Sequence, residues 1–369
     1  MLTRALGWCS SGLALGGLAL EIVNLFEFPL LRPQSGEPGS IVACVAMRNE
    51  AHNVAACLES LLQQPEIAAV VVCDDASDDD TFAILSAIAA REPRVVPLGS
   101  ATRDGSDSGE AGRAGKATVL AFAARQCSAI PARMLLFTDA DVRLNAGAAG
   151  ALLAHADALG VQAVSAWPRT VTHSIWDALF APLVPLFLLQ ALPLRAARLH
   201  PDARFSAGNG QLFLVERRAY ERSGGHMPGA IVEDVTLARA LKRSGARIAL
   251  ASAAAVASVD GYGSFAANVS GYGRSLYYGT GRRGALAFGM WQALAYVVPW
   301  LLLGFARRPA LLAAAAGVTA YGLIARRMRG PRFGFFLPPL TGMAGITMAA
   351  SVAFIGPRRR LCWRGRSLR

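Results

Sequence analysis

Three acidic clusters in this sequence have residue types and spacings suited to binding a divalent cation and moving a proton. One of them, FTDADV (residues 137–142), follows an apolar run. Residues two apart in an extended chain point the same way, so Asp139 and Asp141 can face one cation while Ala140 turns away. Carboxylate oxygens suit Mg²⁺ or Mn²⁺ bound together with a diphosphate. The alternative is a plain polar strand end.

A second acidic cluster, DDASDDDT (residues 74–81), follows another apolar run. Asp74 or Asp75 could accept hydrogen bonds from a ribose or a base, because ligands of open α/β sheets bind beyond the carboxyl ends of the strands. The alternative is an Asp-rich turn and helix cap, with Thr81 near the start of the next helical stretch. The residues alone leave both interpretations open.

The third cluster lies in IVEDVTLARALKRSG (residues 231–245), where Glu233 and Asp234 open a helix with a basic end that stops at Gly245. A carboxylate at this position could take the proton from a substrate hydroxyl group. The helix dipole would favour its ionised form. The alternative is the ordinary negative charge that many helices carry in their first turn.

Alternating strands and helices must position these clusters. The linker RPQSGEPGS (residues 32–40) is rich in Pro, Gly and Ser and marks a boundary. After it we expect strands at residues 41–46, 69–73, 94–98 and 134–138, helices at 51–63, 81–90 and 116–125, and a mobile glycine-rich loop at 99–115. This alternation predicts an α/β fold with a Rossmann-like, mainly parallel sheet.

The order of the motifs resembles that of the family-2 glycosyltransferases, which have the GT-A fold. Each motif is weak alone, but their shared order is specific. The resemblance covers most of residues 41–278 and rests on VAMRNE with Glu50, DDASDDDT, GKATVLAFAA with Lys116, FTDADV, GNGQLFLVERRAYERSGGH (residues 208–226), and the pair Glu233 and Asp234.

The resemblance implies a hexosyltransferase that uses a nucleotide sugar, with a UDP-sugar expected, in a single displacement with inversion. Asp234 is then the catalytic base, with Glu233 beside it. Asp139 and Asp141 are the ligands of Mg²⁺ or Mn²⁺. The implied nucleotide-sugar site comprises Asp74, Asp75, Glu50, Lys116, Asp139 and Arg274.

Within the family, residues 261–279 are similar to the segment before the C-terminal helices of bacterial enzymes that glycosylate carotenoids and other polyisoprenoid lipids, including hopanoid-associated members. A lipid acceptor is therefore expected. Two features depart from the pattern: no tryptophan precedes the GK pair, and Arg274 stands where lysine is usual. Ser275 follows Arg274 in place of the tryptophan found in processive polysaccharide synthases, so transfer of a single sugar is expected.

Four apolar segments favour a membrane protein. They cover residues 6–31, 285–306, 309–325 and 333–356, in a chain of 369 residues that is 53% hydrophobic and 17% charged. Each is close to the ~20 residues that cross a bilayer. The net charge of +12 comes largely from arginines beside these segments, which is typical of helices anchored at anionic headgroups. This placement favours a membrane over nucleic acid as the partner.

The predicted domains are an N-terminal membrane anchor or interfacial helix (1–32), a GT-A domain (39–278), a C-terminal transmembrane region (284–356) and a basic tail (357–369). We expect a multi-pass protein of the bacterial inner membrane with a cytoplasmic catalytic domain, which suits six scattered cysteines without a CxxC motif. Residues 285–306 and 309–325 should form a hairpin, and residues 333–356 should re-enter without crossing. The C-terminus then lies in the cytoplasm.

Two further segments are expected near the membrane. The apolar, proline-rich residues 176–194 should lie on its surface or in an acceptor groove, or else form a buried helix. The glycine-rich stretch before residue 285 should lie at the interface, able to move, with Arg274 contacting the donor diphosphate. Arg282 and Arg283 are expected to be a plain basic flank.

Two other functions compete with glycosyl transfer. A sugar nucleotidyltransferase would also use an α/β sheet and acidic metal ligands, but it would need neither the pair Glu233 and Asp234 nor four apolar segments. A catalytically silent membrane scaffold would not need three intact acidic clusters. Metal-dependent hydrolysis of nucleotide sugars would separate these alternatives.

Overall fold

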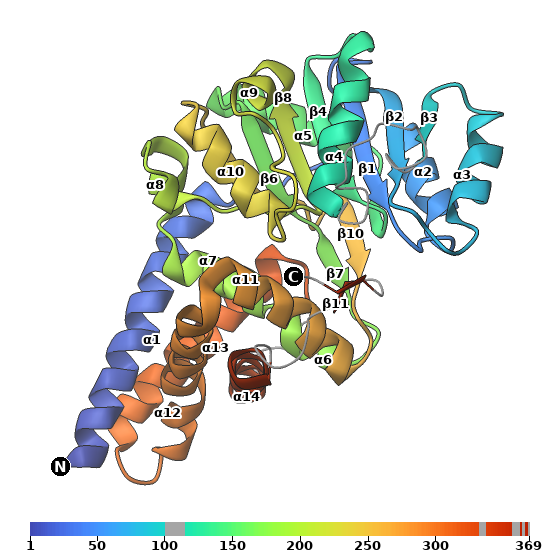
Figure 1. Cartoon of the computed structure of the whole chain (residues 1–369). Helices are drawn as coiled ribbons and strands as arrows, with labels where there is room; N and C mark the ends of the chain where they lie inside the picture. Colours follow the sequence, from blue (N-terminus) through green and yellow to red (C-terminus); the bar gives the residue numbers. More distant parts are fainter. Residues whose placement is uncertain (100–114, 332–336, 356–361, 364–365, 368–369) are drawn as a thin grey trace. The chain divides into compact units, whose positions relative to one another are not determined.

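Figure 1 shows the computed structural model of the chain, which describes residues 1–99, 115–331, 337–355, 362–363 and 366–367. Most of the glycine-rich loop expected at 99–115 lies outside these residues, as does most of the basic tail. The chain divides into two compact units. Unit 1 comprises Met1–Pro29, Thr170–Leu194 and Asp260–Arg369, and unit 2 comprises Leu30–Arg169 and Arg195–Val259.

Unit 2 is built on a mixed sheet that has, among the described residues, seven strands in the order β3-β2-β1-β4-β8-β6-β9. β1 runs parallel to both β2 and β4, and β3 and β9 run parallel to β2 and β6. β8 runs antiparallel to its neighbours β4 and β6. The strands are β1 (Ile41–Met47), β2 (Ile67–Asp74), β3 (Val95–Leu98), β4 (Met134–Asp139), β6 (Ala163–Trp167), β8 (Leu212–Glu216) and β9 (Ile248–Ser252). The mainly parallel α/β fold expected from the sequence is confirmed.

The central strands of unit 2 are buried almost throughout, as their continuous apolar runs predict for a parallel sheet covered on both faces. Two short strands, β5 (Val142–Leu144) and β10 (Ala257–Asp260), pair antiparallel beside it. β7 (Arg169–Val171) spans the sequence boundary between the units. The helices are α2 (Val54–Leu62), α3 (Thr81–Ala89), α4 (Lys116–Gln126), α5 (Ala148–Leu159), α8 (Leu194–Leu199), α9 (Arg217–Arg222) and α10 (Glu233–Arg243), with short 3₁₀ turns at Cys127–Ala129 and Ala203–Phe205.

The described part of unit 1 is mainly helical and also contains most of β7, the end of β10 and the short β11 (Cys362–Trp363) and β12 (Arg366–Ser367). Within the described residues, three helical stretches are long and apolar enough to cross a membrane: Thr3–Glu27, Phe265–Leu301 and Arg307–Arg327. The helices are α1 (Leu2–Glu27), α6 (Ile175–Phe180), α7 (Leu183–Ala191), α11 (Phe265–Gln292), α12 (Val298–Leu301), α13 (Arg307–Arg327) and α14 (Pro338–Ala350), with π-helical turns at Ala293–Val297 and Ser351–Ile355.

Helices α1 and α13 lie side by side and run in the same direction. Near one end, the Ser11 hydroxyl donates a hydrogen bond to the Pro309 carbonyl oxygen at 2.6 Å. Near the other end, Arg327 Nη1 donates to the Leu25 carbonyl oxygen at 3.0 Å. The last turns of both helices therefore lie at the same level within unit 1.

The polar residues of α1 hold α7, as expected for an apolar helix that packs against others. Asn24 Nδ2 donates to the carbonyl oxygens of Leu189 and Leu192 at 2.7 and 2.8 Å. The Gln190 amide donates to Glu21 Oε2 at 2.8 Å. Leu183 in α7 is fully buried. Residues 176–194 thus belong largely to the packed helices α6 and α7, although Trp176 is exposed, and a role at an acceptor groove stays a prediction.

Helix α11 bends sharply at Gly281, whose φ of 71° lies in the left-handed region that glycine adopts without strain. Both arms contact the end of α14 and the turn after it. A Cβ at Gly273 would lie 2.6 Å from Cγ1 of Val352, and one at Gly289 would lie 3.0 Å from Cβ of Ala349. The glycine-rich stretch before residue 285, which was expected to be able to move, is thus part of a helix that begins at Phe265. Most of its glycines lie inside helical turns.

Candidate active site

Two of the acidic clusters lie at one edge of the sheet in unit 2. Asp74 is the last residue of β2 and Asp139 is the last residue of β4, on either side of β1. The register aligns Met47 with Asp74 and Ala46 with Asp139. The carboxyl ends of these three parallel strands therefore bring the clusters to the side where α/β sheets bind ligands.

Lys116, the first residue of α4, joins the metal motif to the third acidic cluster. Its Nζ lies 2.6 Å from Asp139 Oδ1 and forms a second ion pair with Glu233 Oε1. Burial alone would lower the pKa of Lys116, but the two carboxylates outweigh it and hold the pKa well above its usual value. The lysine is therefore a permanent positive charge between two buried carboxylates.

Asp234 is fixed at the start of α10 by two backbone groups. Its Oδ2 accepts a hydrogen bond from the Gly210 N–H at 3.0 Å, and its Oδ1 accepts one from the Val235 N–H at 2.7 Å. The loop before β8 approaches α10 so closely that a Cβ at Gly208 would lie 2.8 Å from the Asp234 carbonyl oxygen. The GNG sequence is thus a steric requirement for holding the carboxylate in place.

The two neighbouring carboxyl groups at the start of α10 differ in their affinity for protons. Burial, supported by the negative charge of Glu233, raises the pKa of Asp234 to about 7. Burial also pushes the pKa of Glu233 upward, but the ion pair and hydrogen bond with Lys116 prevail and lower it. A pKa near neutrality suits a general base, whereas Glu233 stays ionised as the partner of Lys116.

Asp139 and Asp141 lie close enough to influence each other. Burial is the largest cause that raises the pKa of Asp139 to about 6, and the negative charge of Asp141 adds to it despite the proximity of Lys116. In the described part of the chain, no group of three or more His, Cys, Asp or Glu side chains is arranged to hold a metal ion. Two carboxylates still fit Mg²⁺ or Mn²⁺, since such ions often take their remaining ligands from substrate phosphates and water.

The second acidic cluster, DDASDDDT, stabilises its own loop and also lies at the edge of the sheet. The Ser77 N–H donates to Asp74 Oδ2 at 3.1 Å, and the Ser77 hydroxyl donates to Oδ1. The carboxylate of Asp74 therefore stabilises a turn, as the simpler interpretation of this motif proposed. Asp75 is 1% exposed, and its N–H donates to the Met47 carbonyl oxygen at 2.7 Å, which ties the loop to β1.

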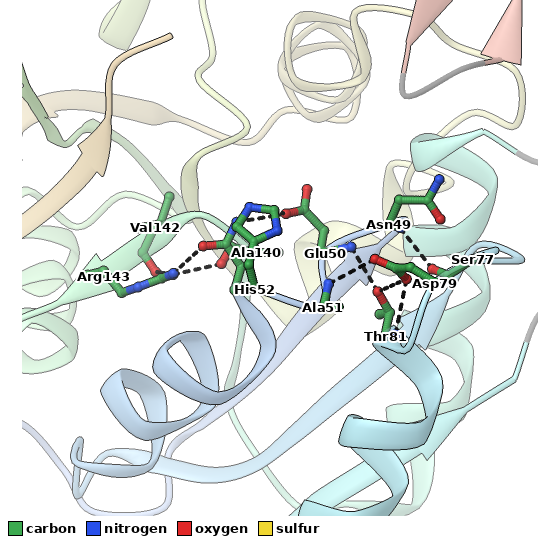
Figure 2. Close-up of polar contacts among 11 residues, drawn as sticks. Asn49, Glu50, Ala51, His52, Ser77, Asp79, Thr81, Ala140, Val142 and Arg143 are labelled. Carbon is green, nitrogen blue, oxygen red and sulfur yellow. Dashed lines mark hydrogen bonds and ion pairs between the residues drawn. The ribbon is translucent and has the colours of Figure 1, made fainter. Parts of the chain in front are cut away.

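The loops after β1 and β2 hold each other through side chains (Figure 2). The Asn49 N–H donates to the Ser77 hydroxyl at 2.9 Å, and the Ala51 N–H donates to Asp79 Oδ2 at 3.2 Å. Asn49 and Ala76 both have a φ of 52°, an uncommon conformation for residues other than glycine. Strained residues of this kind often mark binding sites, and here one lies in each of the loops that follow β1 and β2.

Glu50 is connected to the metal motif through two residues that the sequence analysis did not single out. Its Oε2 accepts a hydrogen bond from Asn53 Nδ2 at 2.7 Å, and Asn53 Oδ1 accepts one from Arg143. Arg143 Nη1 also donates to the Ala140 carbonyl oxygen at 2.7 Å (Figure 2). Arg143 follows FTDADV directly, which is the only sequence signal that could have indicated its role.

Two other buried polar residues hold the surrounding elements. A hydrogen bond of 3.0 Å joins Nδ1 of His226 to the Tyr220 hydroxyl. Burial lowers the pKa of His226 to about 4, so its ring is neutral near pH 7. Lys242, at the far end of α10, is 4% exposed and donates to the carbonyl oxygens of Ala197 and Phe205 at 2.6 and 3.1 Å. No pattern in the sequence indicated either role.

The expected site residues divide between the two units. Unit 2 contains Glu50, Asp74, Asp75, Lys116, Asp139, Asp141, Glu233 and Asp234. Among them, ion pairs join Lys116 to both Asp139 and Glu233. Arg274 belongs to α11 in unit 1, so its contact with a donor diphosphate stays a prediction.

Comparison with known proteins agrees with this geometry. The family described as "Glycosyltransferase like family 2" matches residues 38–277. No curated protein matches the chain. Among solved structures, the mannosyltransferase PcManGT from Pyrobaculum calidifontis, in complex with GDP-Man and Mn²⁺, is similar with a TM-score of 0.58 and 18% identity over 95% of this chain and 98% of its own.

Two further solved structures are less similar. Mannosyl-3-phosphoglycerate synthase from Rubrobacter xylanophilus has a TM-score of 0.38 and 19% identity over 60% of this chain and 67% of its own. TarS 1–349 from S. aureus, in complex with UDP-GlcNAc, has a TM-score of 0.44 and 13% identity over 86% of this chain and 92% of its own. At these sequence identities, structural similarity is evidence for the fold alone. Of these three structures, the mannosyltransferase is the one with a TM-score high enough to support the assignment of the fold.

Proposed function

Because the chain belongs to glycosyltransferase family 2, we propose that it transfers a single sugar from a nucleotide sugar to a hydroxyl group of a membrane lipid, with inversion at the anomeric carbon. The observation that carries the proposal is the arrangement around Lys116. It joins Asp139 at the end of β4 to Glu233, the neighbour of Asp234. A donor-binding motif and a candidate base are thus held together in one unit.

In the proposed reaction, Asp234 removes the proton from the acceptor hydroxyl as its oxygen attacks the anomeric carbon. The bond from that carbon to the nucleoside diphosphate breaks on the opposite face, so the configuration inverts. The backbone N–H groups of Gly210 and Val235 orient the carboxylate, and its pKa of about 7 lets it accept a proton near neutral pH. Glu233 keeps Lys116 in position.

The diphosphate end of the donor would lie near Asp139 and Asp141, which would hold Mn²⁺ or Mg²⁺. Such an ion neutralises charge on a departing diphosphate. Lys116 supplies a further positive charge beside the same carboxylates, and Arg274 is proposed to contribute another. The Mn²⁺ and GDP-Man bound to the mannosyltransferase from P. calidifontis support a metal-assisted donor site of this kind. Asp75 and Glu50 would lie beside the nucleoside part of the donor.

A lipid acceptor is supported by the apolar helices of unit 1. Three of its helical stretches are long and apolar enough to cross a membrane. Several large apolar side chains on them are exposed, among them Phe26 on α1 and Leu311 and Leu312 on α13. Exposed apolar surface of this kind suits a bilayer. We therefore propose a multi-pass protein of the bacterial inner membrane that meets its acceptor there, with a carotenoid, a hopanoid or another polyisoprenoid as the acceptor class.

The proposal is tested by following the leaving group. The purified protein is incubated in detergent with UDP-sugars or GDP-mannose, with and without Mn²⁺, and with a lipid extract. We expect release of the nucleoside diphosphate that depends on metal and increases with lipid, and no release by Asp234→Asn above the rate of donor hydrolysis by water.

Two other outcomes would contradict the proposal. Pyrophosphate released from a nucleoside triphosphate and a sugar phosphate would identify a sugar nucleotidyltransferase. No turnover with any donor, together with no donor binding, would identify a catalytically silent scaffold.

A further inference from the structure

Unit 1 contains a pocket with a mainly apolar lining. Its wall is formed by Thr170 and Thr172, by the junction of α6 and α7, by the C-terminal part of α13 and by the start of α14. Ligand pockets are typically lined in this way, with a few polar groups that fix the orientation of the ligand.

The described wall of the pocket is uncharged. Ala178, Ala181 and Pro182 contribute to one side, and Ile324 and Ala325 contribute to another. The only side-chain polar groups among the described lining residues are the hydroxyls of two threonines near β7 and of Tyr321 and Thr341. None of the described lining residues is cationic, so the described wall offers nothing to compensate the lost hydration of a phosphate group.

The buried hydroxyls of Tyr321 and Thr341 interact with each other, and neither has another hydrogen-bond partner among the described residues. The two side chains are 2% and 1% exposed. The Tyr321 ring packs edge to face against Tyr296 with 5.4 Å between the ring centroids, and the Tyr296 hydroxyl donates to Gln190 Oε1 at 2.6 Å. The ring of Tyr321 is thus held in place, with its hydroxyl at the pocket wall.

Two hydroxyls that share one hydrogen bond use only one of their two protons, so the other proton is available to a ligand oxygen. The pocket combines such hydroxyls with an apolar wall, and α13, which supplies part of it, is a candidate membrane span. A ligand that enters from the bilayer and is apolar along most of its length matches both features.

We propose that this pocket binds the apolar body of an uncharged lipid, with a lipid oxygen hydrogen-bonded to Tyr321 or Thr341. Only one part of the inference rests on the proposed function, namely that the bound lipid is the sugar acceptor. It narrows the acceptor to a neutral lipid alcohol and disfavours a lipid phosphate.

Photolabelling tests the pocket without requiring sugar transfer. The full-length protein in bilayer nanodiscs is labelled with a diazirine-bearing farnesol, or with its phosphate ester, and the labelled peptides are identified by mass spectrometry. We expect the alcohol to label peptides that contain Ala181, Ala325 and Thr341 in preference to other apolar peptides. The phosphate ester should label them less.

Ala181→Phe fills the pocket and should reduce this labelling by about tenfold, since a poor fit in an apolar pocket commonly costs that much. Leu312→Phe is the matched control, because Leu312 is 46% exposed on α13 and does not line the pocket. Thr341→Val is nearly isosteric and removes one hydroxyl, so it should weaken labelling even if the larger substitution disturbs folding.

Three results would overturn the inference: labelling spread evenly over the exposed apolar helices, labelling unchanged in both Ala181→Phe and Thr341→Val, or preferential labelling by the phosphate ester. The role as acceptor site is tested separately. Ala181→Phe should raise the KM for lipid acceptor and leave donor hydrolysis by water unchanged. Labelling as expected, without any sugar transfer, would contradict the proposed function and leave the lipid site standing.

Discussion

At the scale of single residues, the active site balances positive and negative charge around Lys116. The sequence predicted that Asp139 lies at a strand end and that Glu233 and Asp234 lie at a helix start, and the structure has them there. It could not predict that Lys116 would join Asp139 to Glu233, since the contact between Lys116 and Glu233 connects positions more than a hundred residues apart. It also missed Arg143 and Asn53, whose polar side chains look like ordinary surface residues in a sequence.

Asp141 is expected to be the main protein ligand of the divalent cation. Asp141→Asn removes one negative charge from the pair at the end of β4, so donor binding should lose its dependence on metal while the protein stays folded. Isothermal titration of the nucleoside diphosphate, with and without Mn²⁺, measures the effect. Full activity of this variant in the presence of EDTA would refute the assignment.

Asp234 is expected to be the general base. Asp234→Asn keeps the shape of the side chain but cannot accept the proton, so kcat should fall by ~10²–10⁴-fold. Donor affinity should change little. Loss of nucleotide binding with wild-type turnover at saturating donor would show that the role is wrong.

The pH dependence gives a second test of Asp234. Burial raises the pKa of its carboxyl to about 7, so the base is protonated and inactive below that pH and ionised above it. We expect kcat/KM to rise with pH and to level off above about 7. A profile that is flat from pH 5 to 8 would contradict the assignment.

At the scale of elements, the sequence predicted the first half of unit 2 better than the second. The runs that became β1, β2, β3 and β4 are short and apolar and alternate with helical stretches, which is a local pattern. β8 was not predicted as a strand between β4 and β6, because that placement depends on antiparallel pairing between distant segments. In α11, glycines that suggested a stretch able to move instead allow this helix to pack closely against the end of α14 and the turn after it.

Gly210 is expected to determine the position of the catalytic helix α10. A Cβ at this residue would lie 2.7 Å from Glu233 Oε1 and 3.0 Å from Lys116 Nζ, so Gly210→Ala must displace one of them. We expect kcat to fall by about tenfold or more, since misplacement of catalytic groups by ~1 Å can cost 10²-fold. Steady-state kinetics with circular dichroism as a folding control measures this.

Gly115→Ala is the matched control. Gly115 directly precedes Lys116, but a Cβ there would meet no atom of the described residues within 4 Å, and its φ of −124° suits alanine. Equal kinetics for Gly210→Ala and Gly115→Ala would mean that the contact between the loop before β8 and α10 has no catalytic role.

At the scale of the whole molecule, the sequence indicated a soluble region between apolar segments. It did not predict two units built from interleaved segments, because residues 170–194 carry no local signal that assigns them to the helical unit. The direction of α13 relative to α1 could not be predicted either. It depends on the hydrogen bonds from Ser11 to Pro309 and from Arg327 to Leu25, which join a helix near the start of the chain to one near its end.

The C-terminus is expected to lie in the cytoplasm. α13 ends beside the last turn of α1, from which the chain enters unit 2, so Arg326 and Arg327 should lie on the catalytic side, as basic residues prefer. Of the described residues that follow, those of α14 form a helix too short to be a candidate span. A C-terminal fluorescent reporter that folds only in the cytoplasm should be active. A reporter active only in the periplasm would refute this topology.

The central claim is that this chain adds one sugar to a membrane lipid with Asp234 as the base. Mass spectrometry of total lipid extracts tests it most directly, by comparing wild type, a deletion strain, and the deletion strain carrying the wild-type or the Asp234→Asn gene. The account predicts a neutral lipid heavier than its precursor by one sugar residue, which disappears in the deletion strain, returns with the wild-type gene and stays absent with Asp234→Asn. A lipid profile that is identical in all four strains, or a product restored fully by Asp234→Asn, would contradict it.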